Sequence, residues 1–424
     1  MRLLPTRIPQ ISLTLPLSFG RRSGESLVGL DIQPGFVAAV QARVNGSIVA
    51  ERAAALALPA DSVRDGEVMD EDAVSEVLRE LFESSGLSKQ VRVGVANQRT
   101  VLRTLELPPV TDQKELAAAV NFQAQDQVPM PLNNAVMDFH PLGIVDTPAG
   151  PRQRVVLVAA QRDMIERLLG AVRRAGLSAQ GVDLSAFALI RSLYRPNPEQ
   201  TGRVLYLNVD GLTNLAIAEG TVCRFTRVVG SGLEGIASEL AERRSIALTE
   251  ARALLAAVDL TAPAQPVQAL PIATDSDAQD SADGAEEPTP EQGQRPISDE
   301  DSEAQERAMS YEEMADVDGA PAAPAPQSDA DLLTALENGI RDISGEVRNS
   351  LDFHRSQDGG GEVSHVVMSG CAQDIPGFAE ALQASLGVEV RCEPMALPEQ
   401  GLADGVSVHR LAIATGLATA EAPQ

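Results

Sequence analysis

The sequence is poor in lysine. Only Lys89 and Lys114 are lysines among its 424 residues, and arginine supplies the rest of the 34 basic side chains. A phosphate-binding P-loop needs a lysine directly after a glycine, and neither lysine follows a glycine. The sequence therefore excludes a nucleotide site of the P-loop type.

Positive charge is scarce in general. The 34 basic residues face 60 acidic ones, which leaves a formal net charge of −26 at pH 7. Proteins that bind nucleic acid neutralise phosphates with clustered lysine and arginine side chains. The composition therefore argues against nucleic acid as a partner.

Cysteine and long apolar runs are also lacking. Cys223, Cys371 and Cys392 are odd in number and scattered, with neither a disulfide framework nor the spacing of metal ligands. This usage favours a reducing compartment, the cytoplasm. No uninterrupted apolar run reaches the length of about 18 residues that a transmembrane helix needs, so we expect none.

A pattern of strand, tight turn and hairpin occurs twice. Residues 27–57 and residues 203–230 both begin with an apolar run that ends in an acid or its amide, Asp31 in the first copy and Asn208 in the second. A glycine-containing turn and an apolar hairpin follow in each copy, and the first hairpin carries Asn-Gly, a strong hairpin signal. The repeat predicts two similar halves around a shared cleft, where small ligands such as nucleotides tend to bind.

Hydrophobic periodicity and turn residues predict the other elements. Helices are expected over 70–85, 111–125, 163–175, 233–244, 249–258, 331–354, 375–386 and 410–420. Strands are expected over 91–96, 100–107, 136–142, 154–160, 365–368 and 388–391. Thr111 is the predicted N-cap of the second helix, and Pro376 is expected in the first turn of the helix that opens at Ile375.

Two segments have the composition of chain outside a folded core. Residues 259–330 contain 18 acidic residues, two arginines and nine prolines, which predicts a disordered acidic linker. Residues 1–26 carry three prolines among scattered apolar and arginine residues, which rules out a long helix. We expect a disordered tail there, with docking on a partner or on anionic lipid as the alternative.

Four segments resemble, in the same order, those of the actin-like ATPases and within them the PilM family of type IV pilus assembly proteins, relatives of the cell-division protein FtsA. They are Gly29–Val40, which looks like a first phosphate loop, Leu107–Gly143, which looks like the inserted subdomain of the family, Leu207–Gly220, which looks like a second phosphate loop, and Val366–Val390, which looks like an adenosine loop.

The resemblance implies an α/β fold, the actin-like duplication of a ribonuclease H-like unit into two domains, with an inserted α+β subdomain of the FtsA and PilM type. The implied division is a tail (1–26), a first half (27–200) that contains the insert (about 101–180), a second half (201–258 and 331–400), the acidic linker (259–330) and a C-terminal helix that returns to the first half (401–424).

The resemblance also implies a cleft for ATP and Mg²⁺. Its nucleotide-binding residues would be Asp31, Gly35, Thr213, Ser369, Gly370 and Gly377. In the family, small residues let backbone N–H groups approach the phosphates, and the acid of the first loop holds Mg²⁺ through water. Asp31 would take that metal role.

The sequence departs from the family pattern within these loops. In the first loop Gln33 replaces a glycine, Ala38 replaces a lysine, and Pro34 removes one N–H donor. In the second loop Asn208 replaces the acid, and Asp210 puts negative charge where phosphate would lie. One such like-charge pair at about 5 Å costs on the order of 3 kcal/mol.

Cys371 replaces the second glycine of the adenosine loop. Two interpretations therefore compete. In one, the cleft binds ATP with Mg²⁺ and its occupancy regulates partner binding. In the other, which we favour, the fold persists as a scaffold with a degenerate pocket. Fast hydrolysis is not expected, because no general base can be placed near the cleft.

By resemblance, the expected function is that of a cytoplasmic scaffold in the assembly of a type IV pilus or related secretion machine, at the inner face of the cytoplasmic membrane. A groove between the first half and the insert would bind the cytoplasmic tail of a PilN-like bitopic inner-membrane protein. Other platform proteins are expected as further partners, and these partners would mediate association with the membrane. Whether the protein associates with itself is left undecided. The alternative is an FtsA-like cell-division filament protein.

Overall fold

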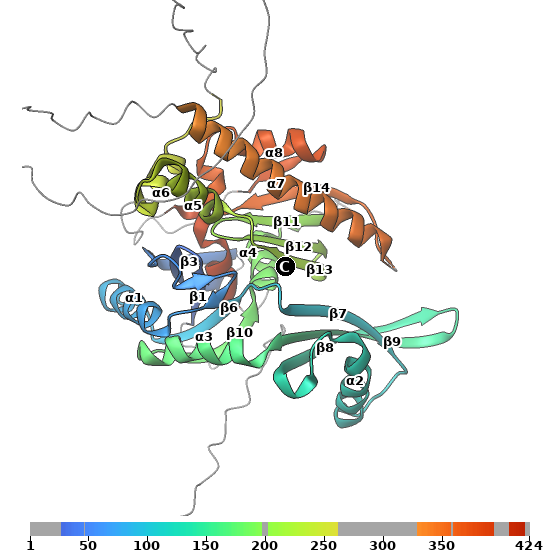
Figure 1. Ribbon diagram of the computed structural model, residues 1–424. Helices are drawn as coiled ribbons and strands as arrows, with labels where there is room; N and C mark the ends of the chain where they lie inside the picture. The colour runs from blue at the N-terminus through green and yellow to red at the C-terminus, as the bar shows by residue number, and fades with distance from the viewer. Residues whose placement is uncertain are drawn as a thin grey trace, which may run out of the picture. The chain divides into compact units, whose positions relative to one another are not determined.

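The computed structural model describes residues 27–45, 47–196, 202–261, 329–357, 359–393 and 407–419. The predicted tail (1–26) and nearly all of the predicted acidic linker (262–328) lie outside these residues. The described elements form two five-stranded sheets with helices on their faces and a smaller three-stranded sheet (Figure 1).

The two large sheets have the same topology. The first has the order β10-β6-β1-β2-β3 and the second has the order β13-β12-β11-β14-β15. Strands of the first sheet are β1 (Val28–Gln33), β2 (Phe36–Asn45), β3 (Ser47–Ala57), β6 (Gln90–Val95) and β10 (Ser178–Leu184). Strands of the second are β11 (Arg203–Val209), β12 (Thr213–Glu219), β13 (Val222–Val229), β14 (Val363–Ser369) and β15 (Val390–Cys392).

The repeat seen in the sequence is therefore a repeat of structure. In each sheet the first three strands are antiparallel, and two further strands extend the first strand in parallel. Both predicted hairpins are confirmed. The parallel strands end at one edge of each sheet, which places the residues after β1, β11 and β14 close together.

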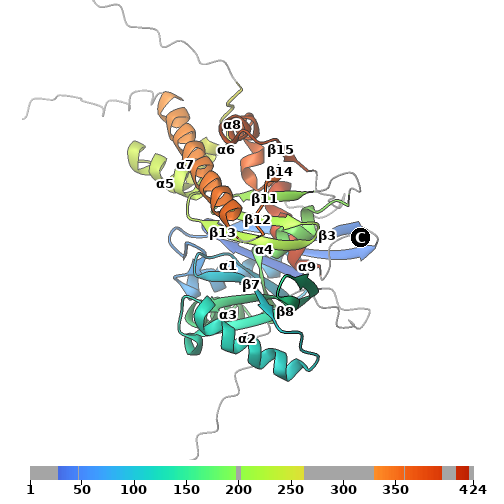
Figure 2. The same ribbon diagram turned by 90° about the vertical axis from the view of Figure 1, so that its right-hand side faces the viewer.

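Helices cover the outer face of each sheet. On the first sheet, α1 (Glu71–Ser85) packs against α3 (Arg162–Arg174) (Figure 1). Asp70 caps α1 by accepting from the Asp72 and Ala73 N–H groups, and Gly86 ends the helix in the left-handed conformation. On the second sheet, α7 (Asp329–Ser356) lies across one face and packs against α5 and α8 (Figure 2). The remaining helices of this half are α5 (Leu233–Arg244), α6 (Leu248–Ala256) and α8 (Phe378–Leu386).

Two helices lie between the sheets, and each one packs on the half to which it does not belong in sequence. α4 (Ser185–Leu193) follows the first sheet but packs on β12 of the second. α9 (Ala412–Ala418) follows the second sheet but packs on β1 and β2 of the first. The two helices also pack against each other. This exchange joins the two halves through a buried apolar layer.

Glycines permit this close packing. A Cβ atom at Gly416 would overlap the carbonyl oxygen of Ala188 on α4, and a Cβ atom at Gly29 would overlap the carbonyl oxygen of Ala414 on α9. The C-terminal carbonyl groups of α9 accept hydrogen bonds from arginines of the first half, since Arg92 Nη1 donates to Thr419 (2.8 Å) and Arg191 Nε donates to Gly416 (3.0 Å). Cationic groups stabilise this end of a helix.

The insert is a three-stranded sheet, β7-β9-β8, that packs on both faces. Its strands are β7 (Thr100–Leu107), β8 (Ala135–Thr147) and β9 (Gly150–Gln161). Along β9, Val155, Leu157 and Ala159 join a core with α2 (Gln113–Gln127). The alternate residues Val156, Val158 and Ala160 join the core of the first half, through α3. The insert is thus anchored by one sheet face.

Four expectations differ from the structure. Asp112 and not Thr111 caps α2, because the Asp112 carboxylate accepts from the Lys114 and Glu115 N–H groups. α8 begins at Phe378, after Gly377 at φ 84°, so Pro376 precedes its first turn. The β8–β9 hairpin is longer than expected and runs past α2 (Figure 1). α4, β10 and the two short strands β4 (Val63–Arg64) and β5 (Glu67–Val68) were not predicted. The domain boundaries inferred from sequence stay predictions.

The close approach of α9 to β1 gives a direct test. Gly29→Ala is expected to lower the free energy of unfolding by about 3 kcal/mol, because the added methyl group overlaps the backbone of α9. Urea unfolding measures this. Gly345→Ala on α7 is the control, since a Cβ there meets nothing within 4 Å and alanine favours a helix. Equal stability of the two variants would contradict the packing.

Candidate functional site

A cavity of about 350 Å³ lies where the ends of β1, β11 and β14 meet. The first half contributes the turn at Pro34 and Gly35 together with Phe36. Asp210 and Cys371 come from the ends of β11 and β14, and Arg410 comes from the 3₁₀ turn η3 (Val408–Leu411) before α9. This is the cleft between the halves that the doubled pattern predicts.

Asp210, Cys371 and Arg410 form a cluster in this cavity. The Cys371 thiol donates to Asp210 Oδ1 at 2.8 Å, and Arg410 Nε donates to the same oxygen at 3.2 Å. Arg410 Nη2 lies 2.9 Å from Cys371 Sγ. The guanidinium also lies over the ring of Phe36, with 4.1 Å between the guanidinium carbon and the ring centroid. Stacking of this kind stabilises a desolvated cation.

Burial governs protonation in the cluster. Asp210 is 1% exposed, and its burial raises the pKa of the carboxyl group while Arg410 opposes this shift. Burial and the neighbouring Asp210 raise the pKa of the Cys371 thiol, so Cys371 stays a thiol and donates. Burial disfavours the charged form of Arg410, but Asp210 and Cys371 more than offset this and raise the pKa of Arg410. Arg410 is therefore a fixed cation.

Asp31 lies on β1 and is buried, 1% exposed. Gln33 Nε2 donates to Asp31 Oδ2 at 2.7 Å. Burial raises the pKa of Asp31 to about 7; the bond from Gln33 and the charge of Arg410 oppose the shift, and Asp210 adds to it. The hydrogen bond from Gln33 therefore occupies one oxygen of the carboxyl group to which the resemblance assigns the Mg²⁺ role.

The other predicted site residues make contacts within the protein. Thr213 Oγ1 donates to the Ser231 carbonyl (2.6 Å) and Ser369 Oγ donates to Asn208 Oδ1 (2.9 Å). The Gly370 N–H donates to the His409 carbonyl, and Gly377 lies against Leu260. Of the six residues, Gly35 is among those that line the cavity. Their role in nucleotide binding stays a prediction.

Phe36 and Arg410 are the site residues that sequence reasoning missed. Arg410 stands directly before an apolar run, Leu411–Leu417, which is buried throughout. A charged residue beside such a run is the signal that could have identified it, because buried charges need a partner. The partner, Asp210, is 200 residues away in the sequence.

The residues of the cleft do not fit ATP with Mg²⁺. The two phosphate loops meet, since a Cβ atom at Gly211 would overlap the carbonyl oxygen of Pro34. Both arginines among the lining residues are paired, Arg410 with Asp210 and Arg252 with Glu234 (Nε to Oε2, 2.9 Å). A triphosphate would therefore meet the buried carboxylate of Asp210, and neither arginine among the described lining residues is unpaired.

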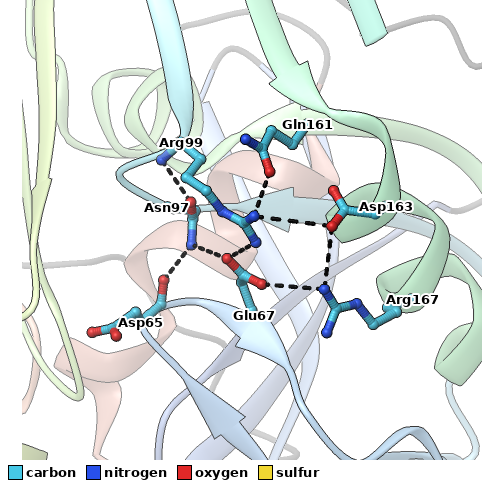
Figure 3. Close-up of polar contacts among 7 residues, drawn as sticks. All are labelled: Asp65, Glu67, Asn97, Arg99, Gln161, Asp163 and Arg167. Atoms are coloured by element: carbon cyan, nitrogen blue, oxygen red, sulfur yellow. Dashed lines mark hydrogen bonds and ion pairs between the residues drawn. The ribbon is translucent and has the colours of Figure 1, made fainter. Parts of the chain in front are cut away.

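A second polar site joins the insert to the first half (Figure 3). Glu67 on β5 (Glu67–Val68) accepts from Arg99 in the turn before β7, and its other oxygen lies 3.6 Å from Arg167 of α3. Asp163 lies 3.4 Å from Arg167 and 3.9 Å from Arg99. Gln161 at the end of β9 accepts from Arg99. This network fixes the insert against the first half.

A cavity of about 390 Å³ adjoins this network and shares Gln161 and Asp163 with it. Its other lining residues come from the turn after α2 and the first turns of α3: Met130, Pro131, Asn134, Arg162 and Glu166. These lining residues all lie within the predicted insert (about 101–180), and α3 packs on the first half, near where the resemblance implies a peptide groove.

The duplicated sheets, the exchanged helices and the cleft between the halves define an actin-like protein with an inserted subdomain. The family model of the type IV pilus assembly protein PilM matches residues 29–252, more than half of the chain. The chain belongs to this family. The α/β actin-like fold expected from the sequence is thereby confirmed.

A solved structure agrees with the fold. The chain is similar to a structure described as the PilM-PilN type IV pilus biogenesis complex, with 18% identity and a TM-score of 0.62 over 93% of this chain and 98% of that one. It also matches the ethanolamine utilization protein EutJ from Carboxydothermus hydrogenoformans, with 15% identity and a TM-score of 0.45 over 96% and 92% of the two chains. Among the described residues, no helix is long and apolar enough to cross a membrane.

The protonation of Asp31 predicts an unusual pH dependence. Its folded pKa of about 7 lies above the ordinary value of 3.8, so the folded state binds the proton more tightly. Tighter proton binding adds to the free energy of unfolding. This contribution is fully present below about pH 4 and is lost as the pH rises through 7. Asp31→Asn should therefore raise the free energy of unfolding at pH 8 by an order of 2–4 kcal/mol, at about 1.4 kcal/mol per pKa unit, and change little at pH 4.

Urea unfolding at pH 4, 6 and 8 measures this dependence. Asp342→Asn, at an exposed position on α7, is the control and should leave the pH profile of the wild type unchanged. An Asp31→Asn protein that is less stable than the wild type at pH 8 would show that the ionised carboxylate is the stabilising form.

Proposed function

We propose that the chain is a scaffold in type IV pilus assembly that binds the cytoplasmic tail of a PilN-like inner-membrane protein without the need for nucleotide. The match to the PilM family over residues 29–252 carries this proposal. It favours a pilus role over the FtsA-like alternative. The similar PilM-PilN structure makes a PilN-like protein the first partner to test.

The groove for the tail is the 390 Å³ cavity at the junction of the insert and the first half. Its size suits a few side chains of an extended peptide. Asp163 is held by the network around Glu67, which gives the cavity one firm wall, and Glu166 is exposed on α3 at its side. A short tail can bind such a preformed groove at low entropic cost.

Charge supports the same occupant. Segments on the cytoplasmic side of a bitopic membrane protein are enriched in lysine and arginine. The chain has a net charge of −26, and Glu166 places a carboxylate beside the cavity. Electrostatic attraction would speed the encounter and set the orientation of the tail. The protein would then work at the inner face of the cytoplasmic membrane, held there by its partner.

The interpretation in which ATP regulates partner binding is the second candidate. The paired arginines and the hydrogen bond from Gln33 to Asp31 speak against it. Isothermal titration with Mg-ATP separates the two. Binding of Mg-ATP at micromolar concentration, abolished by Asp31→Ala, would support the regulatory candidate. It would contradict the part of the proposal in which the scaffold works without nucleotide.

Charge reversal beside the groove tests tail binding. A synthetic peptide with the sequence of the PilN-like tail, titrated into the full chain, should bind the wild type in the micromolar range. Glu166→Arg should weaken binding at least tenfold, about 1.4 kcal/mol, because it places a cation beside a basic peptide.

Glu80→Arg is the matched control. Glu80 is exposed on α1, and its substitution changes the net charge by the same amount as Glu166→Arg. Its affinity should stay within twofold of the wild type. Equal weakening by both variants would mean that net charge and not this groove governs binding. No binding to the wild type would contradict the proposed function.

A further inference from the structure

Arg410 contacts both halves of the protein with one side chain. Its guanidinium bonds to Asp210 and Cys371 of the second half and lies over Phe36 of β2 in the first half. The turn η3 that carries it is tied to the second half, because the Gly370 N–H donates to the His409 carbonyl at 3.1 Å. The next element, α9, packs on the first sheet.

We propose that Arg410 is an internal bridge that closes the cleft between the halves with the chain's own cation, at the place where a bound nucleotide would otherwise join them. The inference concerns the state of the cleft and does not rest on tail binding. It assigns a role to Asp210 and Cys371, the residues that depart from the family pattern.

The departures are chemically matched to one another. Asp210 brings a carboxylate to a position that is 1% exposed, and an unpaired carboxylate there would be strongly unfavourable. Arg410 supplies the counter-charge through Nε, and Cys371 supplies a further donor to the same oxygen. Charge-assisted bonds of this kind are stronger than neutral ones. Asp210 and Cys371, the two departures, thus both bond to Arg410.

The loops around the bridge are packed together. Pro34 of the first half meets Gly211 of the second. A Cβ atom at Gly35 would lie 2.6 Å from Glu234 Oε2, so the turn of the first half also reaches α5. Glu234 is in turn paired with Arg252 of α6. The contact between the two loops and the contacts of Arg410 therefore stabilise the same closed arrangement of the cleft.

Guanidinium geometry is needed for this role. One planar group bonds to Asp210, contacts Cys371 and stacks on Phe36 at the same time. The ammonium group of lysine is a compact charge that can pair with the carboxylate but cannot also stack as a plane. Arg410→Lys should therefore keep the charge pair and lose part of the bridge.

Hydrogen exchange on the full chain, followed by mass spectrometry, tests the bridge. In Arg410→Ala, the amides of residues 35–37 and 208–214 should exchange at least tenfold faster than in the wild type. The core of α1, residues 74–82, should exchange at the same rate in both. Arg410→Lys should fall between the two proteins. Addition of 1 mM Mg-ATP should leave exchange in the wild-type cleft unchanged.

Arg252→Ala is the matched control, because Arg252 lines the same cavity but pairs within the second half. It should change exchange at the two cleft segments by less than twofold. If Arg410→Ala does not fold, Asp210→Asn provides the second variant and should speed exchange at the same segments. Unchanged cleft exchange in these variants, equal effects of Arg252→Ala and Arg410→Ala, or protection of the wild-type cleft by Mg-ATP would each overturn the inference.

Discussion

The structure depends on the close crossing of α4 and α9 between the two sheets. Gly416 allows the backbone of α9 to reach Ala188 of α4, and Gly29 allows the same helix to lie on β1. Because each helix packs on the half to which it does not belong in sequence, neither half can bury its inner sheet face alone. The cleft exists because this crossing holds the ends of β1, β11 and β14 together.

The chemistry of the cleft follows from that constraint. Arg410 directly precedes the buried run that forms α9, so packing of the helix fixes where the guanidinium can lie. Asp210, buried after β11, is its partner. The charges of the cleft thus satisfy each other inside the protein. Around the cavity of the cleft, the buried carboxylate of Asp210 is thus paired with a cation from the same chain.

The sequence predicted those parts of the structure that depend on local pattern. Apolar runs and glycine-containing turns identified the doubled hairpins, and helical spacing of apolar residues identified α1. α4 was not predicted because it is a short helix of nine residues, and all of them, Arg191 included, are buried, so its polar side chains do not mark a face exposed to solvent. The contact between Asp210 and Arg410 was not predicted, because the two residues meet only through the exchange of helices. No local signal reports a contact between residues so far apart.

The insert carries a second cavity, whose lining residues are not shared with the cleft. It is anchored on α3 through β9 and held by the ionic network around Glu67, and the cavity at its edge is separate from Arg410. In this account, partner binding at the insert needs no signal from a nucleotide in the cleft.

The most direct test is the affinity for the PilN-like tail peptide with and without saturating Mg-ATP, measured by titration calorimetry on the full chain. Two linked sites change each other's affinity by the same factor. The account predicts a dissociation constant that is the same within twofold in both conditions. A change of tenfold or more would contradict it, because nucleotide would then bind and control the partner site.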